Sequence, residues 1–336
     1  MSRTTAAGLA RGAAFTAAGI AFPFVFQAAW IVNIGVLTLM YAALATAWNL
    51  FSGYTGYISL GQAAFFGLGA YSLAITFEHV GAGSGYNPFF ALPLVAAGVA
   101  LASVPVAWIA LRTRHMTFAI VTLTLLFIVQ QLAFNLHSLT KGSTGLMLPT
   151  PRFPIDSYDR PFYMAMLAIL LLGLGLCWLT LRSKLGLMLF AIREDEEKAR
   201  GLGMRVTGGK LIAWSLMVWL SAMVGGVWAY YLTFIYPESS VDPLVMIGAV
   251  LMTFLGGRGT LWGPTLGALL LVPAQQYMIT RLGASEFYLV GYSAVFVVVL
   301  LLLPRGILPS LRDALAALRE RRRTHREPVV RGEARA

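Results

Sequence analysis

The chain has 336 residues, of which 58% are hydrophobic and only 12% are charged. Because a soluble domain carries about 25% charged residues, this chain has too few polar groups to cover a water-facing surface. Its net charge of +11 does not indicate a nucleic-acid partner, because the basic residues lie between and beyond the apolar segments, as in cytoplasmic loops of membrane proteins. We therefore expect the lipid bilayer to surround most of the chain.

Ten apolar segments are candidate membrane spans. A spanning helix needs about 20 apolar residues to cross a hydrocarbon core about 30 Å thick. No Lys, Arg, Asp or Glu occurs between Arg11 and Glu78, which leaves room for three spans there. The third candidate is rich in glycine and the eighth is short, so either is a candidate re-entrant or broken helix. The sequence predicts an all-α, polytopic transmembrane helical bundle with about 8–10 spans, drawn from residues 12–28, 29–51, 57–77, 88–111, 115–136, 161–181, 211–235, 243–257, 261–280 and 287–303.

The distribution of Lys and Arg predicts the orientation. Basic residues concentrate in the segment 182–210 and after Arg305, and loops of this kind stay in the cytoplasm. With ten spans, both termini are then cytoplasmic. An uncleaved first helix is expected rather than a signal peptide, because the apolar character continues far beyond any cleavage site. The chain divides into a transmembrane domain, 1–309, with a cytoplasmic loop at 182–210, and a basic cytoplasmic tail, 310–336, which is either an amphipathic surface helix or a frayed terminus.

The predicted spans carry no charge that would mark chemistry or ion coupling. No acidic or basic residue lies near the middle of any of them, and such residues usually mark function. This absence argues against ion-driven secondary transport, although it does not exclude sodium sites built from backbone carbonyls. The nearest approach to a phosphate-binding loop, Gly208 to Leu211, lacks the hydroxyl after the lysine and the first glycine. We expect no catalytic residue, metal site or cofactor in this chain, and ATP to be bound by a separate subunit if it drives transport.

A glycine-rich motif runs from Asn49 to Tyr71 and places small and hydroxylated residues inside an apolar stretch. Glycine permits close helix packing and non-helical backbone, and freed backbone groups at membrane depth are tolerated only inside protein or along a wet path. The alternative is tight packing alone. A second cluster, 256–267, is a weak repeat of the first. The candidates for the translocation path or its packing are Gly53, Thr55, Gly56, Ser59, Gly61 and Gln62 from the first motif, with Gly256, Gly257 and Gly263 from the second.

The loop from Ser183 to Lys210 has a charge order typical of a short cytoplasmic helix. Its centre is acidic near the start and basic near the end, which suits the helix macrodipole, and Gly201 or Gly203 is a candidate helix stop. A solvated loop is the alternative, but a segment of this length between two spans also suits docking on a partner. The candidate coupling residues are Phe190, Ile192, Arg193, Glu194, Glu197, Ala199 and Gly203.

Six stretches together resemble the branched-chain amino acid ABC permease family, and its LivM-type half in particular. They are 53–71, 141–146, 193–203, 222–230, 255–267 and 303–306, and they span almost the whole chain in the family's order. The second stretch adds Thr144 and Gly145 to the path candidates. Two departures, Gln62 where many members have His and a missing double glycine at 141–145, leave the substrate open.

The resemblance implies a multi-pass subunit of a prokaryotic plasma (inner) membrane. Its implied partners are a second permease subunit forming a heterodimer, two cytoplasmic ATPase subunits and a periplasmic or extracellular substrate-binding protein. Arg193 to Arg200 would then be the coupling helix that transmits ATPase motion. The same architecture importing urea, short amides or aromatic carboxylates remains an alternative, as does an ion-coupled secondary transporter. A membrane enzyme is a further class, but the sequence offers no convergent catalytic groups.

Overall fold

The computed structural model describes residues 3–26, 28–80, 85–154, 157–282, 294, 297, 306–311 and 313. The tenth candidate span, 287–303, lies outside the described residues apart from two positions, and so does most of the tail 310–336. The predicted all-α bundle is confirmed. In chain order the elements are α1 (Arg3–Val25), α2 (Ala29–Trp48), the π-helix η1 (Asn49–Gly53), α3 (Gln62–Val80), α4 (Asn87–Ala110), α5 (His115–Asn135), α6 (His137–Thr140), the 3₁₀ turn η2 (Gly142–Thr144), β1 (Leu146–Met147), α7 (Asp159–Arg182), α8 (Lys184–Glu194), α9 (Glu196–Gly201), α10 (Val206–Leu232), β2 (Phe234–Ile235), α11 (Pro237–Ser240), α12 (Pro243–Gly256) and α13 (Gly263–Leu282).

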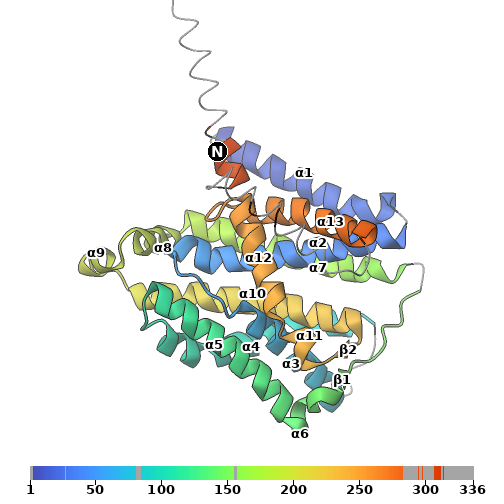
Figure 1. The fold of residues 1–336 in the computed structure, drawn as a ribbon. Helices are drawn as coiled ribbons and strands as arrows, with labels where there is room; N and C mark the ends of the chain where they lie inside the picture. Colours follow the sequence, from blue (N-terminus) through green and yellow to red (C-terminus); the bar gives the residue numbers. More distant parts are fainter. Residues whose placement is uncertain are drawn as a thin grey trace, which may run out of the picture.

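Long helices run side by side through the molecule (Figure 1). Six segments of the described residues are long and apolar enough to cross a membrane: α2 with η1, α4, α5, α7, α10, and α11 with α12. Helix α10 is central, since it packs along α3 and α4. Of an apolar stretch of 18 residues in each helix, 67% is buried in α10 and 28% in α4. On its other side α2 packs on α7, α12 and α13.

The two ends of the bundle differ in structure. Helices α8 and α9 lie at one end, whereas α6, β1 and β2 lie at the opposite end (Figure 1). The strands β1 and β2 form an antiparallel pair, with Leu146 opposite Ile235 and Met147 opposite Phe234. The two ends are therefore separate candidates for contact with different partners.

The third and eighth candidate spans are irregular. After α2 the chain continues as the π-helix η1 and two further helical residues, Tyr54 and Thr55, and residues 56–61 then form no helix until α3 begins at Gln62. We call residues 56–61 the break. Helix α12 has 14 residues and at 1.5 Å per residue is about 21 Å long, shorter than a hydrocarbon core of about 30 Å. The glycine content of the third segment and the shortness of the eighth make each a candidate broken or re-entrant helix in the sequence, and the structure shows the break beside one and a short helix in the other.

Glycines let α3 and α10 approach at backbone distance. A Cβ added at Gly69 would overlap the backbone of Ala222, and one added at Gly225 would overlap the carbonyl oxygen of Phe66. The obstacle at both positions is backbone of the opposite helix, so a side-chain rotation cannot relieve it. The central pair of helices depends on these small residues, as membrane helix pairs commonly do.

We expect Gly69→Ala to destabilise the bundle by about 1–3 kcal/mol, the range typical of overpacking. The matched control is Gly98→Ala in α4, where an added Cβ meets nothing within 4 Å. Thermal unfolding of both variants in the same detergent measures the difference. Equal unfolding temperatures for Gly69→Ala, Gly98→Ala and the wild type would contradict this packing.

Candidate functional site

Two arginines hold the chain just before the break. The Arg193 guanidinium donates to the carbonyl oxygen of Gly53 at 3.0 Å, and that of Arg258 donates to the carbonyl oxygen of Ser52 at 3.0 Å. A helix leaves its last carbonyls without partners inside the helix, and its C-terminal end favours cations. The two side chains therefore satisfy the end of η1 from two distant parts of the sequence.

The two glycine clusters lie in contact. The side-chain oxygen of Asn49 accepts a hydrogen bond from the Gly259 amide at 2.7 Å, and its amide nitrogen donates to the Thr260 carbonyl at 2.9 Å. Gly257 and Gly259 have positive φ angles of 121° and 80°, conformations that favour glycine. Asn49, which follows α2 and begins η1, thus joins this part of the chain to the turn between α12 and α13. Sequence reasoning proposed a repeat here but did not place the clusters together.

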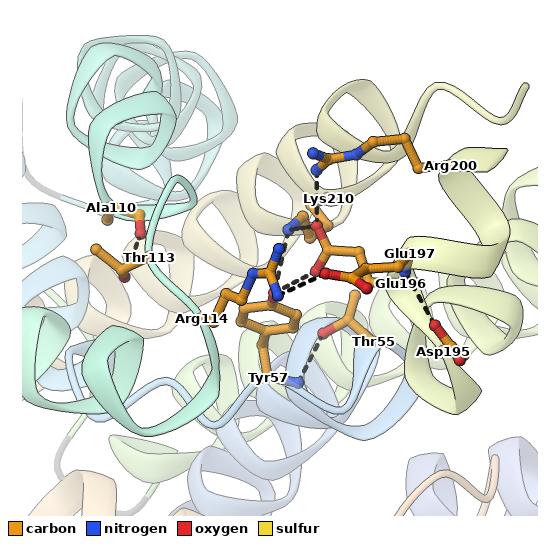
Figure 2. A network of polar contacts seen from close by, with 10 residues as sticks. All are labelled: Thr55, Tyr57, Ala110, Thr113, Arg114, Asp195, Glu196, Glu197, Arg200 and Lys210. Carbon is orange, nitrogen blue, oxygen red and sulfur yellow. Dashed lines mark hydrogen bonds and ion pairs between the residues drawn. The ribbon is translucent and has the colours of Figure 1, made fainter.

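A buried ion-pair cluster joins the break to the loop 182–210. The cluster consists of Tyr57, Glu196, Arg200 and Lys210 (Figure 2). The Glu196 carboxylate accepts from Lys210 Nζ at 2.9 Å, from Arg200 Nη2 at 3.0 Å and from the Tyr57 hydroxyl. Lys210 Nζ also lies 4.4 Å from the centroid of the Tyr57 ring. Tyr57 belongs to the break, so the cluster connects it to α9 and to the start of α10.

The Arg200 side chain is 62% exposed, but the other members of the cluster are shielded from water, so removing one of them costs more than breaking a surface pair. The side chain of Lys210 is 2% exposed and that of Glu196 is 13% exposed. Burial alone would raise the pKa of the Glu196 carboxyl, but the hydrogen bonds from Tyr57 and Lys210 outweigh it, and the pKa lies below its ordinary value. Glu196 therefore stays ionised at neutral pH, and its stabilising effect is lost only as the pH falls through that lowered pKa.

An exposed ion pair extends the cluster toward α5. Arg114 and Glu197 pair at 2.8 Å, but their side chains are 69% and 74% exposed. Exposed pairs of this kind contribute about 0–1 kcal/mol. This contact therefore adds little to what the buried cluster provides.

The loop 182–210 holds two short helices rather than the single coupling helix predicted from Arg193 to Arg200. The Ser183 side chain caps α8 by accepting from the Gly186 amide at 3.4 Å. Helix α8 ends before Asp195. The Asp195 carboxylate accepts from the amides of Glu197 and Lys198, both at 3.0 Å, and so caps α9. Hydrogen bonds from the Lys198 amide and side chain, with that of the Glu197 amide, hold the pKa of Asp195 below its ordinary value. An N-cap residue lies outside the helix it begins, which explains the division.

The candidate coupling residues face in two directions. Ile192 and Ala199 are buried within the chain, and the Phe190 ring packs on Tyr54 with centroids 5.5 Å apart. These apolar side chains hold the loop on the bundle rather than offering a surface to a partner. Glu194 and Glu197 are exposed, Arg193 holds Gly53, and Gly203, with a positive φ of 81°, follows the end of α9.

The path candidates of the first motif lie in and around the break, and all of them are buried except Gly56, which is half-buried. The side-chain nitrogen of Gln62 donates to the Leu44 carbonyl at 2.8 Å and to Ser221 Oγ at 3.0 Å, and Thr55 Oγ1 donates to the Phe51 carbonyl at 2.8 Å. Among the described residues, Gln62 Oε1 and Ser59 Oγ are buried without a hydrogen-bond partner. Such orphaned groups cost about 1–3 kcal/mol each, so water or another polar group in this region would stabilise them.

The remaining path candidates divide between the two ends of the bundle. Gly256, Gly257 and Gly263 lie at the α12–α13 turn beside Asn49 and Thr260, where Gly256 and Gly263 touch. Thr144 and Gly145 lie in a different region, next to β1 and β2. Tyr57, Glu196, Lys210, Asn49 and Arg258 were missed as site residues. Within the described ranges, no three His, Cys, Asp or Glu residues gather as metal ligands do.

The comparisons with known proteins decide the family. The family model described as "Branched-chain amino acid transport system / permease component" matches residues 8–304. The chain belongs to this family. It is therefore the permease component of a transport system and a multi-pass membrane protein, and the resemblance drawn from its motifs is confirmed.

Curated relatives of this permease agree with the family. It is 28% identical, over 88% of its length and 74% of theirs, to the high-affinity branched-chain amino acid transport system permease proteins LivM of Salmonella typhimurium strain LT2 and of Escherichia coli strain K12. It is also 31% identical to the autoinducer 2 import system permease protein LsrC of Yersinia pestis strain Pestoides F. That match covers 33% of this chain and 32% of LsrC. No solved structure gives a significant match.

Proposed function

We propose that this permease is the membrane-spanning subunit of an ATP-driven ABC importer for branched-chain amino acids and forms half of its translocation path. Membership of the family and similarity to LivM along 88% of the chain support this substrate class. The permease lies in the plasma membrane of a prokaryote with both termini in the cytoplasm. It pairs with a second, different permease subunit, receives substrate from a binding protein and uses two ATPase subunits that bind the ATP.

The observation that carries the proposal is the buried ion-pair cluster. Helix α9, in the most basic internal loop, is connected through Glu196 to Tyr57, which lies five residues before the first residue of α3. Arg193 makes a second connection, to Gly53, which lies just before the break. An ATPase subunit that displaces α8 and α9 thereby displaces the start of the break and the helical residues just before it.

The break is suited to open and close because it has few helical hydrogen bonds of its own and because two polar groups without partners lie in it and at the first residue of α3. Ser59 Oγ and Gln62 Oε1 are buried and unpartnered in the described part of the chain. In a state open to water or substrate these groups gain partners, which offsets part of the cost of opening. The break is therefore the segment where motion of the loop becomes a change in the path.

Reconstitution tests the proposal. We expect proteoliposomes that contain this permease, its partner permease, both ATPase subunits and the binding protein to accumulate leucine only with ATP on the ATPase side. The permease alone is expected to neither hydrolyse ATP nor accumulate leucine, because its Gly208–Leu211 segment lacks the features of a phosphate-binding loop. Radiolabelled uptake and phosphate release, measured in the same vesicles, check both statements.

Two outcomes would contradict the proposal, one its energy source and the other its substrate class. Gradient-driven uptake by the permease alone would identify an ion-coupled secondary transporter and exclude the importer. ATP-dependent uptake of urea, short amides or aromatic carboxylates, with no uptake of leucine, isoleucine or valine, would retain the architecture and exclude the substrate class.

A further inference from the structure

A cavity of about 550 Å³ lies at the end of the bundle opposite α8 and α9. Its lining combines one acidic and one basic side chain, Glu78 and Lys141, with apolar side chains that include Phe77, Met147 and Phe234. Small-molecule sites are typically 300–1,000 Å³, mostly apolar, with a few placed polar groups. Resting on the proposed function, we propose that this cavity holds a zwitterionic amino acid with an apolar side chain on the outer face of the permease.

The charges in the cavity match a zwitterion. Lys141 Nζ and Glu78 Oε1 lie 2.6 Å apart, and the two side chains are 52% and 40% exposed. A zwitterionic solute can replace this contact with two new ones, because its carboxylate pairs with Lys141 and its ammonium pairs with Glu78. An exposed ion pair contributes only about 0–1 kcal/mol, so opening it costs little. A solute with one charge leaves the other protein charge without a partner, and urea or an amide pairs with neither.

The backbone fixes Lys141 at this position. Lys141 has a positive φ of 56° and is followed by Gly142 with a φ of 55° and Gly145 with a φ of 72°. Thr144 Oγ1 donates to the Lys141 carbonyl at 2.6 Å. An added Cβ at Gly145 would lie 2.5 Å from the Ile235 carbonyl oxygen, so this loop is packed directly against β2. The cationic side of the cavity is therefore formed before any solute arrives.

An apolar surface lies beside the charges. Phe77 is buried and stacks on Tyr230 with ring centroids 6.5 Å apart, which holds its ring in place. Met147 is 81% exposed and Phe234 is 42% exposed, so both have apolar area that a leucine or isoleucine side chain would cover. Burial of a side chain of this size provides about 1.5–3 kcal/mol, which is enough to separate these amino acids from glycine.

Binding of L-leucine to the full chain in lipid nanodiscs, measured by saturation-transfer NMR, tests the site. We expect Glu78→Gln and Lys141→Met each to weaken leucine binding at least tenfold. The matched control is Glu238→Gln, which removes an exposed carboxylate of α11 outside the cavity lining and leaves binding unchanged. Leucinol, which lacks the carboxylate, and 4-methylpentanoate, which lacks the ammonium, are expected not to displace leucine. Both substituted side chains are exposed, and the unfolding temperature of each variant verifies the fold.

Three results would overturn the site. The wild-type chain binds no leucine, or all variants bind leucine as tightly as the wild type, or the variants weaken association with the binding protein but leave leucine binding unchanged. The last would make the cavity a protein-docking surface. ATP-driven uptake in the complete transporter separates this failure from that of the proposed function. Wild-type uptake in both cavity variants would remove the site and leave the importer intact, whereas absence of leucine uptake by the complete wild-type transporter would remove the proposed substrate class.

Discussion

Replacement of Glu196 by alanine is expected to lower the free energy of unfolding by about 3–5 kcal/mol, the range for breaking a buried ion pair from one side. The reason is that Lys210, whose side chain is 2% exposed, loses the carboxylate that neutralises its charge. The Tyr57 hydroxyl, 3.4 Å from Lys210 Nζ, is a neutral acceptor and does not replace the lost carboxylate. Denaturant unfolding of the purified permease in detergent, with wild type in parallel, measures the loss.

Lys198→Ala is the matched control for Glu196→Ala. It removes an ion-pair partner from the same helix, but the Lys198 side chain is 83% exposed and its pair with Asp195, at 3.1 Å, lies on the surface. The expected loss is below about 1 kcal/mol. Similar losses in the two variants would show that burial does not strengthen the cluster.

The double variant Glu196→Gln, Lys210→Met separates stability from coupling. Removing both charges leaves no buried charge without a partner, so stability is expected to recover most of the loss. Uptake is not expected to recover, because the charged connection from α9 to Tyr57 is gone. ATP hydrolysis and uptake measured together in proteoliposomes then give fewer solute molecules per ATP than wild type.

The second large effect is expected from Gly56→Leu, which should reduce uptake at least tenfold while the protein still inserts in the membrane. Gly56 has a positive φ of 82°, and a side chain there costs about 1–2 kcal/mol in the left-handed region. An added Cβ would also lie 3.1 Å from Cγ of Arg193. The leucine side chain would therefore push Arg193 away from the Gly53 carbonyl and release the loop from the break.

Gly61→Leu and Gly175→Leu complete this series. At Gly61 an added Cβ would lie 2.6 Å from the Thr122 carbonyl oxygen, so loss of uptake is expected there too. At Gly175, on an exposed face of α7, it meets nothing within 4 Å, and uptake should be unchanged. Normal uptake in both Gly56→Leu and Gly61→Leu, with insertion shown by membrane fractionation, would exclude the break from the path and its packing.

Sequence reasoning located the helices because hydropathy is a local property. The segments 88–111, 115–136 and 161–181 coincide closely with α4, α5 and α7. It also identified the glycine-rich third segment as a candidate break, since glycine and hydroxyl residues inside an apolar run weaken a helix. Asp195, followed by two glutamates, carried an N-cap signal that would have divided the coupling helix in two.

The buried cluster could not be predicted in the same way. Tyr57 and Lys210 are 153 residues apart, and no periodicity connects them. Lys210 lies where a basic loop meets an apolar helix, a position where lysine usually reaches toward solvent. Lys210 is buried because α9 packs against the start of α10 and places Glu196 beside it, which is a tertiary contact. The contact of Asn49 with Gly259 is likewise set by packing of helices that are distant in sequence.

The surface of the loop 182–210 decides where a crosslink can be placed. Ala199 is buried, so a cysteine there is directed into the bundle, whereas Lys198 is exposed on the same helix. The single native cysteine, Cys177, is buried and is replaced by serine for this experiment. Met147, which is 81% exposed at the opposite end of the bundle, is the matched control position.

Crosslinking from Lys198→Cys to an ATPase subunit in the assembled, active transporter tests the central claim most directly. The coupling role of α8 and α9 predicts a crosslinked product from this position, with a yield that changes when ATP is added, and none from Met147→Cys. No product from Lys198→Cys or from Glu194→Cys, in a transporter that still imports leucine with ATP, would contradict it.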